Sequence, residues 1–395
     1  MSMTIGLAGK PNAGKSTFFK AATLANVDIA DYPFTTINAN HGVTYVQVEC
    51  PCKEKENACG KCVDGMRLVP IDIIDVAGLV PEAYKGRGLG NIFLDELRQA
   101  QAIIHVLDAS GSTDAEGNLV EIGAHNPLED LTFLDREISM WIYGILKRNW
   151  VKLARKIHSE GLKLEVVIAE QLAGAGIKES NVSLALIETG LLKVDHVKWS
   201  EEDIIHLCDS MRRISKPQLI AANKADIAPS NNLDKIKNFD DRIVVTTSAA
   251  AELALKSAAK NGIIRYTPGG RNFDLLTNDL TTAQKKGLES IQKVIYKLGS
   301  TGIQECINRT VFELLDLIVV YPVEDEGKWS DKHGNILPDA YLMKKGSKCR
   351  DLAYQIHTEI GNKFLYGVDA RTRLRLGEKH ELKNGDIIKI ISTAK

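Results

Sequence analysis

Residues 9–16 read GKPNAGKS, and they are the strongest indication of the fold. It matches the pattern G-x-x-x-x-G-K-S, and it stands between a β-rich run at 3–8 and a helical pattern that starts at Gly14. A glycine-rich turn in this position lets successive backbone N–H groups converge on phosphate oxygens, and the start of the helix adds its positive dipole end. The sequence therefore predicts a phosphate site. Its expected members are Gly9, Asn12, Ala13, Gly14, Lys15, Ser16 and Thr17.

Three side chains and one amide around this loop predict a bound triphosphate with magnesium. Lys15 would contact the β- and γ-phosphates, and the hydroxyl of Ser16 would bind Mg²⁺. Asp75 closes a later β-rich run in the sequence DVAG, where its carboxylate can hold Mg²⁺ through water. The N–H of Gly78 in the same motif can contact the γ-phosphate.

Two later segments predict which base is bound. Residues 223–226 read NKAD at the end of another β-rich run, where Asp226 can accept from both N1–H and the 2-amino group of guanine. Adenine offers no such pair of donors. Asn223 can bond the base edge, and the stem of Lys224 can cover its face. After a further run, the segment Ser248-Ala249-Ala250 would place a backbone N–H at guanine O6.

The order of β-rich and helical patterns predicts three domains. Alternating short runs predict an α/β, P-loop NTPase fold with a doubly wound, mostly parallel sheet, in residues 1–126 and 214–316. Long helical periodicity in 127–213, with an apolar stripe that includes Leu134 and Ile138, predicts a helical, coiled-coil-like insertion that we expect to be a hairpin. Strands around one helix in 317–395 predict a β-grasp module.

Composition excludes several classes of protein. The chain has 395 residues, 44% hydrophobic and 26% charged, which is typical of globular proteins with more than one domain. The net charge of −1 gives no bulk attraction to nucleic acid or to a membrane. Residues 1–30 lack a signal peptide, and no window has roughly 18 apolar residues. We therefore expect a cytoplasmic protein without a membrane partner. We also expect a monomer.

Two further stretches are similar to the switches of GTPases of the Obg superfamily, in the TRAFAC class: YPFTT at 32–36, and GLV at 78–80 followed by GRGLG at 86–90. The helical insertion, with the Tyr-x-Pro-Gly loop at Tyr266, is similar to the YchF branch, and the C-terminal module resembles a TGS domain. The resemblance matches Thr36 to the switch threonine that caps Mg²⁺ and the γ-phosphate. It implies GTP/GDP and Mg²⁺ as ligands, and ribosomes or RNA as partners of the TGS-like and helical domains.

Two segments determine what this resemblance implies for activity. They are the NKAD stretch at 223–226, which is the fourth sequence motif of these GTPases, and the GLV stretch at 78–80 in their second switch. Many YchF proteins carry an altered fourth motif with relaxed or adenine-directed specificity, whereas Asn-Lys-x-Asp is intact here, which implies GTP. Leu79 stands where Ras-like enzymes keep a glutamine that orients the attacking water, and leucine cannot hydrogen-bond water. Catalysis would then depend on Lys15, Thr36, the Gly78 amide and Mg²⁺, with slow intrinsic hydrolysis.

Asn12 offers one further catalytic group. It is similar to the asparagine that coordinates a monovalent cation in potassium-activated GTPases, and a K⁺ ion there could replace an arginine finger. The alternative is an ordinary P-loop asparagine that faces solvent.

Four of the seven cysteines, Cys50, Cys52, Cys59 and Cys62, lie within thirteen residues. Cys-x-x-Cys with an internal glycine has the shape of a metal knuckle, and four thiolates suit structural Zn²⁺. Because spacing does not fix connectivity, two disulfides and free thiols on a hairpin remain alternatives.

The C-terminal module carries arginines at alternate positions, Arg371, Arg373 and Arg375. On a strand they would share one face and could contact an RNA backbone, and a solvated, salt-bridged face is the alternative.

Two functions fit these observations. The first is a GTPase whose switches are ordered by GTP and released by hydrolysis. The second is an RNA- or ribosome-associated scaffold that binds ATP or GTP without significant hydrolysis.

Overall fold

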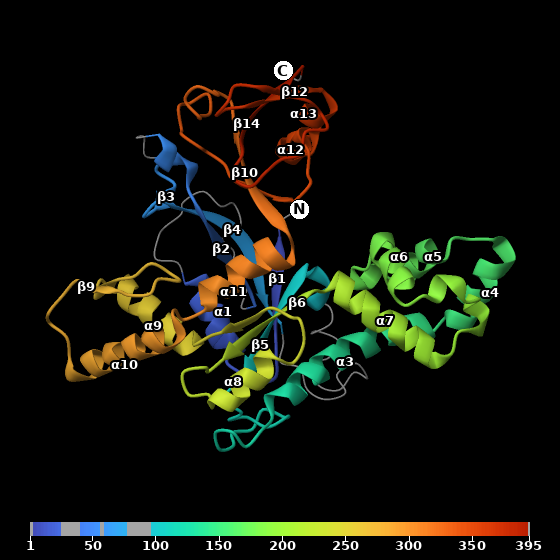
Figure 1. Cartoon of the computed structure of the whole chain (residues 1–395), viewed down its shortest axis with the longest axis horizontal. Helices are drawn as coiled ribbons and strands as arrows, with labels where there is room; N and C mark the ends of the chain where they lie inside the picture. Colours follow the sequence, from blue (N-terminus) through green and yellow to red (C-terminus); the bar gives the residue numbers. More distant parts are fainter. Residues whose placement is uncertain (1–2, 25–39, 56–58, 77–95, 394–395) are drawn as a thin grey trace. The chain divides into compact units, whose positions relative to one another are not determined.

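The computed structural model describes residues 3–24, 40–55, 59–76 and 96–393 (Figure 1). The predicted switch residues Thr36, Gly78 and Leu79 lie outside these ranges. The chain forms two compact units, Met1–Thr44 with Ile71–Cys306, and Tyr45–Pro70 with Ile307–Lys395.

A seven-stranded sheet has the strand order β2-β4-β1-β5-β6-β7, with β3 paired to β4. The strands are β1 (Thr4–Ala8), β2 (His41–Glu49), β3 (Cys62–Val63), β4 (Met66–Asp75), β5 (Ala102–Asp108), β6 (Gln218–Asn223) and β7 (Val244–Thr246). From β4 through β1, β5, β6 and β7, every neighbouring pair is parallel. All residues of β5 and β6 are buried, because helices cover both faces of such a sheet. The predicted P-loop NTPase fold is thereby confirmed.

Helices and one short hairpin complete the sheet domain. They are α1 (Lys15–Thr23), α8 (Ser230–Lys237), α9 (Ala249–Lys260), β8 (Ile264–Arg265), β9 (Asp274–Leu275), α10 (Thr282–Leu298) and α11 (Ile303–Arg309). Strand β1 lies between β4 and β5, so the strand order reverses at β1. Ligands of open α/β sheets bind at such a point, and the loop that follows β1 is the GKPNAGKS stretch.

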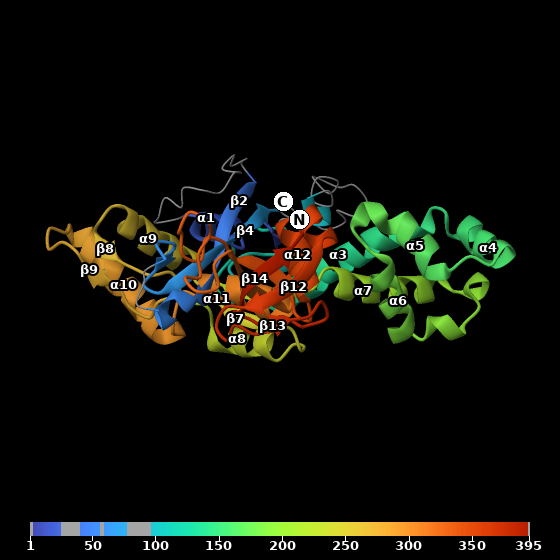
Figure 2. The same cartoon turned by 90° about the horizontal axis from the view of Figure 1, so that it is seen from above.

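The helical region is built from five helices rather than one hairpin (Figures 1 and 2). They are α3 (Pro127–Lys147), α4 (Trp150–Glu160), α5 (Leu164–Leu172), α6 (Glu179–Glu188) and α7 (Glu201–Ser215). Gly161, Gly176 and Gly190 adopt φ values of 64°, 74° and 71°, so each ends a helix in a left-handed turn that glycine adopts without strain. These turns divide the periodic pattern into short helices.

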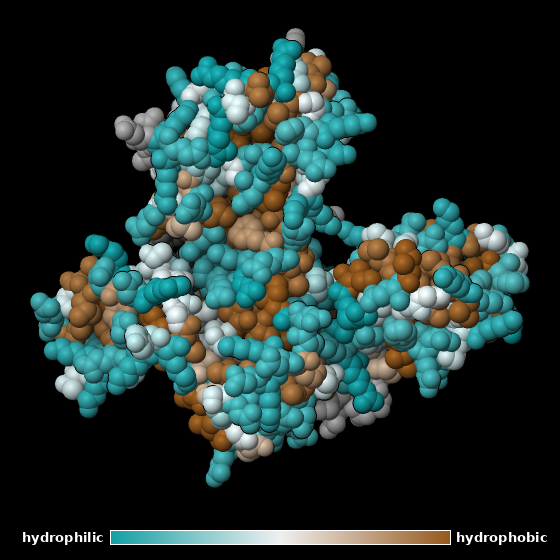
Figure 3. All heavy atoms as spheres, viewed as in Figure 1, coloured by the Kyte–Doolittle hydropathy of each residue, from teal (hydrophilic) through white to brown (hydrophobic). Residues whose placement is uncertain are grey.

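The two long helices of this region, α3 and α7, pack on each other. The apolar stripe expected on α3 is buried at Leu134 and Ile138, and Trp150 stacks on Trp199 with ring centroids 5.1 Å apart. Hydrophobic side chains also remain on the surface of the helical region (Figure 3). They include Leu184, Ile187, Leu192, Val194 and Val197.

The second unit contains a five-stranded sheet with the order β11-β10-β14-β12-β13. Its elements are β10 (Leu317–Val323), β11 (Tyr341–Lys344), α12 (Cys349–Ile356), α13 (Thr358–Asn362), β12 (Phe364–Asp369), β13 (Arg375–Leu376) and β14 (Ile387–Ser392). Strands β10 and β14 are parallel, and the other pairs are antiparallel. Leu352 of α12 packs in one cluster with Val320 and Ile388 of the sheet, which is the predicted β-grasp arrangement.

Residues 45–70 also belong to the second unit. They comprise the end of β2, a short helical turn at Pro51–Glu54, β3 and the start of β4. No helix among the described residues combines the length and the apolar character needed to cross a membrane.

Candidate GTP-binding site

The P-loop connects β1 to α1, and two of its glycines are required by close neighbours. A Cβ atom on Gly9 would lie 2.4 Å from the carbonyl oxygen of Val106, and one on Gly14 would lie 2.2 Å from Nδ2 of Asn223. Gly14 also has φ 95° and precedes α1. Because the first N–H groups of a helix have no partner within it, the amides of Lys15, Ser16 and Thr17 are available to a phosphate.

The side chains predicted to hold phosphate and magnesium come together at this loop. The ammonium of Lys15 forms an ion pair with the carboxylate of Asp75, which ends β4, and both side chains are about nine-tenths buried. Ser16 is exposed in the first turn of α1. The lysine predicted to bind phosphate and the two residues predicted to hold magnesium therefore share one edge of the sheet.

Asn223 links three motifs of the site. Its Nδ2 donates to the carbonyl of Ala13 (2.9 Å), and its Oδ1 accepts from the amide of Ala249 (3.0 Å) and from the hydroxyl of Thr247 (3.3 Å). Because the side chain is buried, this bridge fixes the P-loop to the segment that begins α9. Sequence reasoning assigned Asn223 to the base edge and missed this bridging role, which depends on tertiary contacts.

The side chains of Asp108 and Ser112, which the sequence did not indicate as site residues, hold the ammonium of Lys224. The Nζ of Lys224 lies 2.9 Å from Oδ2 of Asp108 and 3.2 Å from Oγ of Ser112. Asp108 is fully buried at the end of β5. Burial opposes its ionisation, but hydrogen bonds from Ser110, Thr113 and Lys224 hold the pKa of this carboxyl below its usual value. A fixed ammonium leaves the stem of Lys224 in a defined position.

The backbone N–H groups of residues 248–250 were predicted to include the donor to guanine O6. The amide of Ala249 is bonded to Asn223, and the amide of Ser248 donates to the carbonyl of Thr301 (2.9 Å). Ala250 follows in the first turn of α9, where N–H groups lack helical partners. Within this segment, Ala250 is therefore the amide that could reach guanine O6.

Asp226 is the predicted guanine acceptor, and it is half-buried three residues after the end of β6. In the ranges that the structure describes, its carboxylate has no protein partner, whereas Asn223 and Lys224 are both held by neighbours. The acceptor expected to recognise guanine is thus available to a ligand.

A buried carboxylate supports the start of α9. Glu252 accepts from the hydroxyls of Tyr266 (2.6 Å) and Thr301 (2.5 Å), and it is fully buried. Tyr266 opens the Tyr-x-Pro-Gly loop, so this loop contributes a structural contact to the guanine side of the site. No single stretch of sequence indicates this network.

Replacing Tyr266 with phenylalanine should lower the free energy of unfolding by about 1.5–3 kcal/mol, because Glu252 would lose a hydrogen bond in a buried position. Tyr296→Phe is the matched control, since Tyr296 is 91% exposed and should change stability by at most about 0.5 kcal/mol. Urea denaturation of both variants measures the difference. Equal midpoints for the two would contradict a supporting role for Glu252.

A loop at 110–125 contacts the P-loop, and the sequence did not predict these contacts. The Nζ of Lys10 donates to the carbonyl of Thr113 (2.7 Å) and pairs with Asp130 of α3 (2.8 Å). The Nδ2 of Asn12 donates to the carbonyl of Gly117 (3.0 Å). Asn12 is exposed, but its amide nitrogen is held rather than free in solvent.

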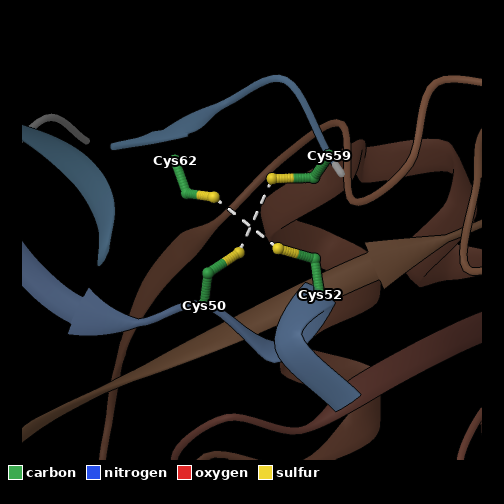
Figure 4. A group of neighbouring side chains, drawn as sticks. All are labelled: Cys50, Cys52, Cys59 and Cys62. Carbon is green, nitrogen blue, oxygen red and sulfur yellow. Dashed lines mark hydrogen bonds between the residues drawn. The ribbon is translucent and has the colours of Figure 1, made fainter. Parts of the chain in front are cut away.

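The four clustered cysteines converge in the second unit (Figure 4). No disulfide joins the four, and their Sγ atoms lie within 4.8 Å of one another.

The three arginines of the C-terminal module do not share one strand, because only Arg375 belongs to β13. Residues 370–372 form a turn, and Arg373 adopts φ 62°. Arg371 pairs with Glu54, which agrees with the salt-bridged alternative.

Three family models match the chain in the order of its structure. Residues 4–135 match the family described as 50S ribosome-binding GTPase, 221–325 match the Obg-like GTPase YGR210-like, G4 motif-containing domain, and 333–392 match the TGS domain. Fold and site therefore define a P-loop GTPase with a C-terminal TGS domain.

Whole-chain relatives define the family. An uncharacterized GTP-binding protein of Methanocaldococcus jannaschii is 50% identical over 398 residues, covering 99% of both chains. A crystal structure of a GTP-binding protein from Pyrococcus horikoshii is 43% identical with a TM-score of 0.79, covering 99% of this chain and 100% of that one. The ribosome-binding ATPase YchF of Bacillus subtilis is 38% identical over 269 residues, covering 64% of this chain and 68% of the relative. This chain belongs to the Obg-like GTPases, in their YchF-like branch.

Proposed function

We propose that this protein binds GTP with Mg²⁺ and hydrolyses it slowly to GDP and phosphate as a conformational switch. The observation that carries the proposal is the available carboxylate of Asp226 at the sheet edge, beside Asn223 and Lys224, which are already fixed. A carboxylate can accept two hydrogen bonds from guanine at once, and it would repel the acceptor that adenine presents in the same place.

Binding of phosphate and Mg²⁺ would separate the ion pair that Lys15 and Asp75 form at the P-loop. We infer that Lys15 turns from Asp75 to the β- and γ-phosphates, while Asp75 and the hydroxyl of Ser16 serve Mg²⁺. The phosphates would then neutralise the positive charge of Lys15 in place of Asp75. The P-loop amides and the N-terminus of α1 would complete the positioning.

Hydrolysis would depend on positioning and charge. We assign catalytic roles to Lys15, Asn12, Thr36 and the Gly78 amide. Leu79 follows Gly78 in sequence and cannot orient water, so we expect a slow intrinsic rate. The contact of Asn12 with Gly117 leaves its side-chain oxygen as the group that would coordinate K⁺.

Exchange of Na⁺ for K⁺ should raise the wild-type GTP turnover number by about tenfold or more, a small part of what an arginine finger supplies. Asn12→Ala should abolish this response because it removes the coordinating oxygen. Asn118→Ala, an exposed change in the adjoining loop, should keep it. Turnover measured in matched NaCl and KCl buffers checks the prediction, and equal wild-type rates in both would refute the cation role.

We propose ribosomes or ribosomal RNA as the partner, bound through the TGS and helical domains by a cytoplasmic monomer. Support comes from the YchF relative that is named ribosome-binding and from the match of residues 4–135 to ribosome-binding GTPases. We propose 1–126 with 214–316, 127–213 and 317–395 as the functional domains.

The second candidate is a scaffold that binds ATP or GTP on RNA or ribosomes without significant hydrolysis. The switch leucine and the name ATPase among the relatives favour it. GTP turnover measured with and without purified ribosomes distinguishes the two functions. Slow turnover that ribosomes accelerate is expected for the switch, and no hydrolysis above a Lys15→Ala background in either case would support the scaffold.

A further inference from the structure

The four cysteines are arranged as the ligands of one tetrahedral metal ion. The Sγ atoms of Cys50 and Cys59 are 3.6 Å apart, as are those of Cys52 and Cys62, and the two contacts cross at the centre of the group (Figure 4). Zinc–sulfur bonds of about 2.3 Å in a tetrahedron place neighbouring sulfurs about 3.8 Å apart. The recorded spacing is therefore close to that of a four-thiolate zinc site.

Two turns of the backbone bring the four sulfur atoms together. Cys50 follows β2, and the helical turn at Pro51–Glu54 brings Cys52 to the same side. In the second pair, Gly60 has φ 67°, and the amide of Lys61 lies 3.4 Å from Sγ of Cys59. An N–H group directed at a cysteine sulfur stabilises a thiolate ligand. The amide of Cys50 donates to the carbonyl of Gly65 (2.9 Å), which closes the hairpin.

Two buried donors of the second unit support the same interpretation. Tyr321 is fully buried in β10, and Arg67 pairs with Cys62 across the β3–β4 ladder. Within the described chain, the hydroxyl of Tyr321 and Nη1 of Arg67 are buried without a hydrogen-bond partner. Such donors are costly beside neutral thiols, whereas the thiolates of a metal centre carry the negative charge that they would stabilise.

We propose that Cys50, Cys52, Cys59 and Cys62 bind one structural Zn²⁺ ion, and that the metal fixes the hairpin at 45–70 to the TGS module. Three of the four side chains are buried, so the site is closed to substrate and suits a structural ion. This proposal is independent of which nucleotide the P-loop binds.

Contacts of the segment that follows Cys52 show what the metal would fix. Two residues after Cys52, Glu54 accepts two hydrogen bonds from Arg371 (2.6 and 2.7 Å). Lys55 donates to the carbonyl of Gly327 (2.5 Å), and its Nζ lies 4.1 Å from the ring centroid of Trp329. These partly exposed ion pairs and cation–π contacts are individually weak, so a turn held by a metal would help to keep them together.

The hairpin also joins the strands that border the predicted switches. β2 begins at His41, shortly after the stretch that contains Thr36, and β4 ends at Asp75, directly before the stretch that contains Gly78. Zinc would anchor the far ends of both strands. Removal of the metal should therefore lower GTP affinity only modestly, because the phosphate ligands lie at the opposite ends.

Elemental analysis of the full-length protein tests the metal directly. About one zinc per chain is expected from the four-ligand rule. Cobalt substituted for zinc should give the thiolate charge-transfer and tetrahedral d–d absorption bands of a four-sulfur site. Cys62→Ser should lose the metal, whereas Cys208→Ala, a buried change in the helical region, should retain it.

Three results would overturn the proposal, even if every cysteine variant failed to fold. These are sub-stoichiometric zinc with four thiols that react in the native protein, two disulfides detected by mass, and iron in place of zinc. Hydrogen exchange of zinc-loaded and chelated protein tests the structural role. Residues 45–70 and the contacting segments at 325–329 and 369–372 should lose protection on chelation, while α3–α7 should not. Unchanged protection of 45–70 in metal-free protein would overturn the claim that zinc fixes the hairpin.

Discussion

Asp226→Ala should weaken GTP binding by about 2–4 kcal/mol, which is roughly a 30- to 1,000-fold rise in Kd. The change removes a charged acceptor of two hydrogen bonds and leaves two guanine donors unpaired in the site. ATP binding should hardly change, because adenine does not offer that pair of donors. Isothermal titration calorimetry with GTP and ATP measures both affinities.

Asp241→Ala provides the matched control, since Asp241 is an exposed aspartate of the same domain. It should bind GTP as the wild type does. If Asp226→Ala bound GTP with wild-type affinity, Asp226 would not recognise the base and the assignment of the fourth motif would be wrong.

Lys15→Ala should lower GTP turnover by at least about 10²–10³-fold, because a preorganised cation at the transferring phosphoryl group contributes that much to the rate. Ser16→Ala should have a comparable effect through loss of the magnesium ligand. Leu79→Ala should lower turnover far less, since leucine does not position water. Single-turnover hydrolysis of radiolabelled GTP at saturating protein measures the chemical step.

Lys20→Ala tests whether the loss is specific to the loop. Lys20 is exposed in the last turn of the same helix, so the variant should hydrolyse GTP at the wild-type rate. Thermal unfolding of Lys15→Ala should accompany the assay, because Asp75 loses its ion-pair partner. A folded Lys15→Ala protein with wild-type turnover would rule out a P-loop mechanism.

The sequence predicted features that contiguous residues determine. GKPNAGKS requires a turn before a helix, and the structure places it between β1 and α1. The regular alternation of patterns likewise predicted the parallel sheet and the helical region. The stripe through Leu134 and Ile138 was expected to be buried and is buried, because helical periodicity fixes the face of a helix without reference to its neighbours.

Features formed by distant residues were not predictable. Asn223 bridges Ala13 and Ala249, and Asp108 holds Lys224, because the sheet brings the ends of separate strands together. The pairing of Glu54 with Arg371 joins residues 317 positions apart. No local pattern indicates such contacts, so the sequence did not show that Arg371 lies in a turn and pairs with Glu54.

The relative affinity of the wild-type protein for GTP and ATP shows whether its site selects guanine. Calorimetry under matched Mg²⁺ and K⁺ concentrations gives both dissociation constants from one preparation. The proposed guanine site predicts GTP binding at least about 30-fold tighter than ATP binding, the lower bound expected from the contact with Asp226. Equal affinities, or a preference for ATP, would mean that the site does not select guanine.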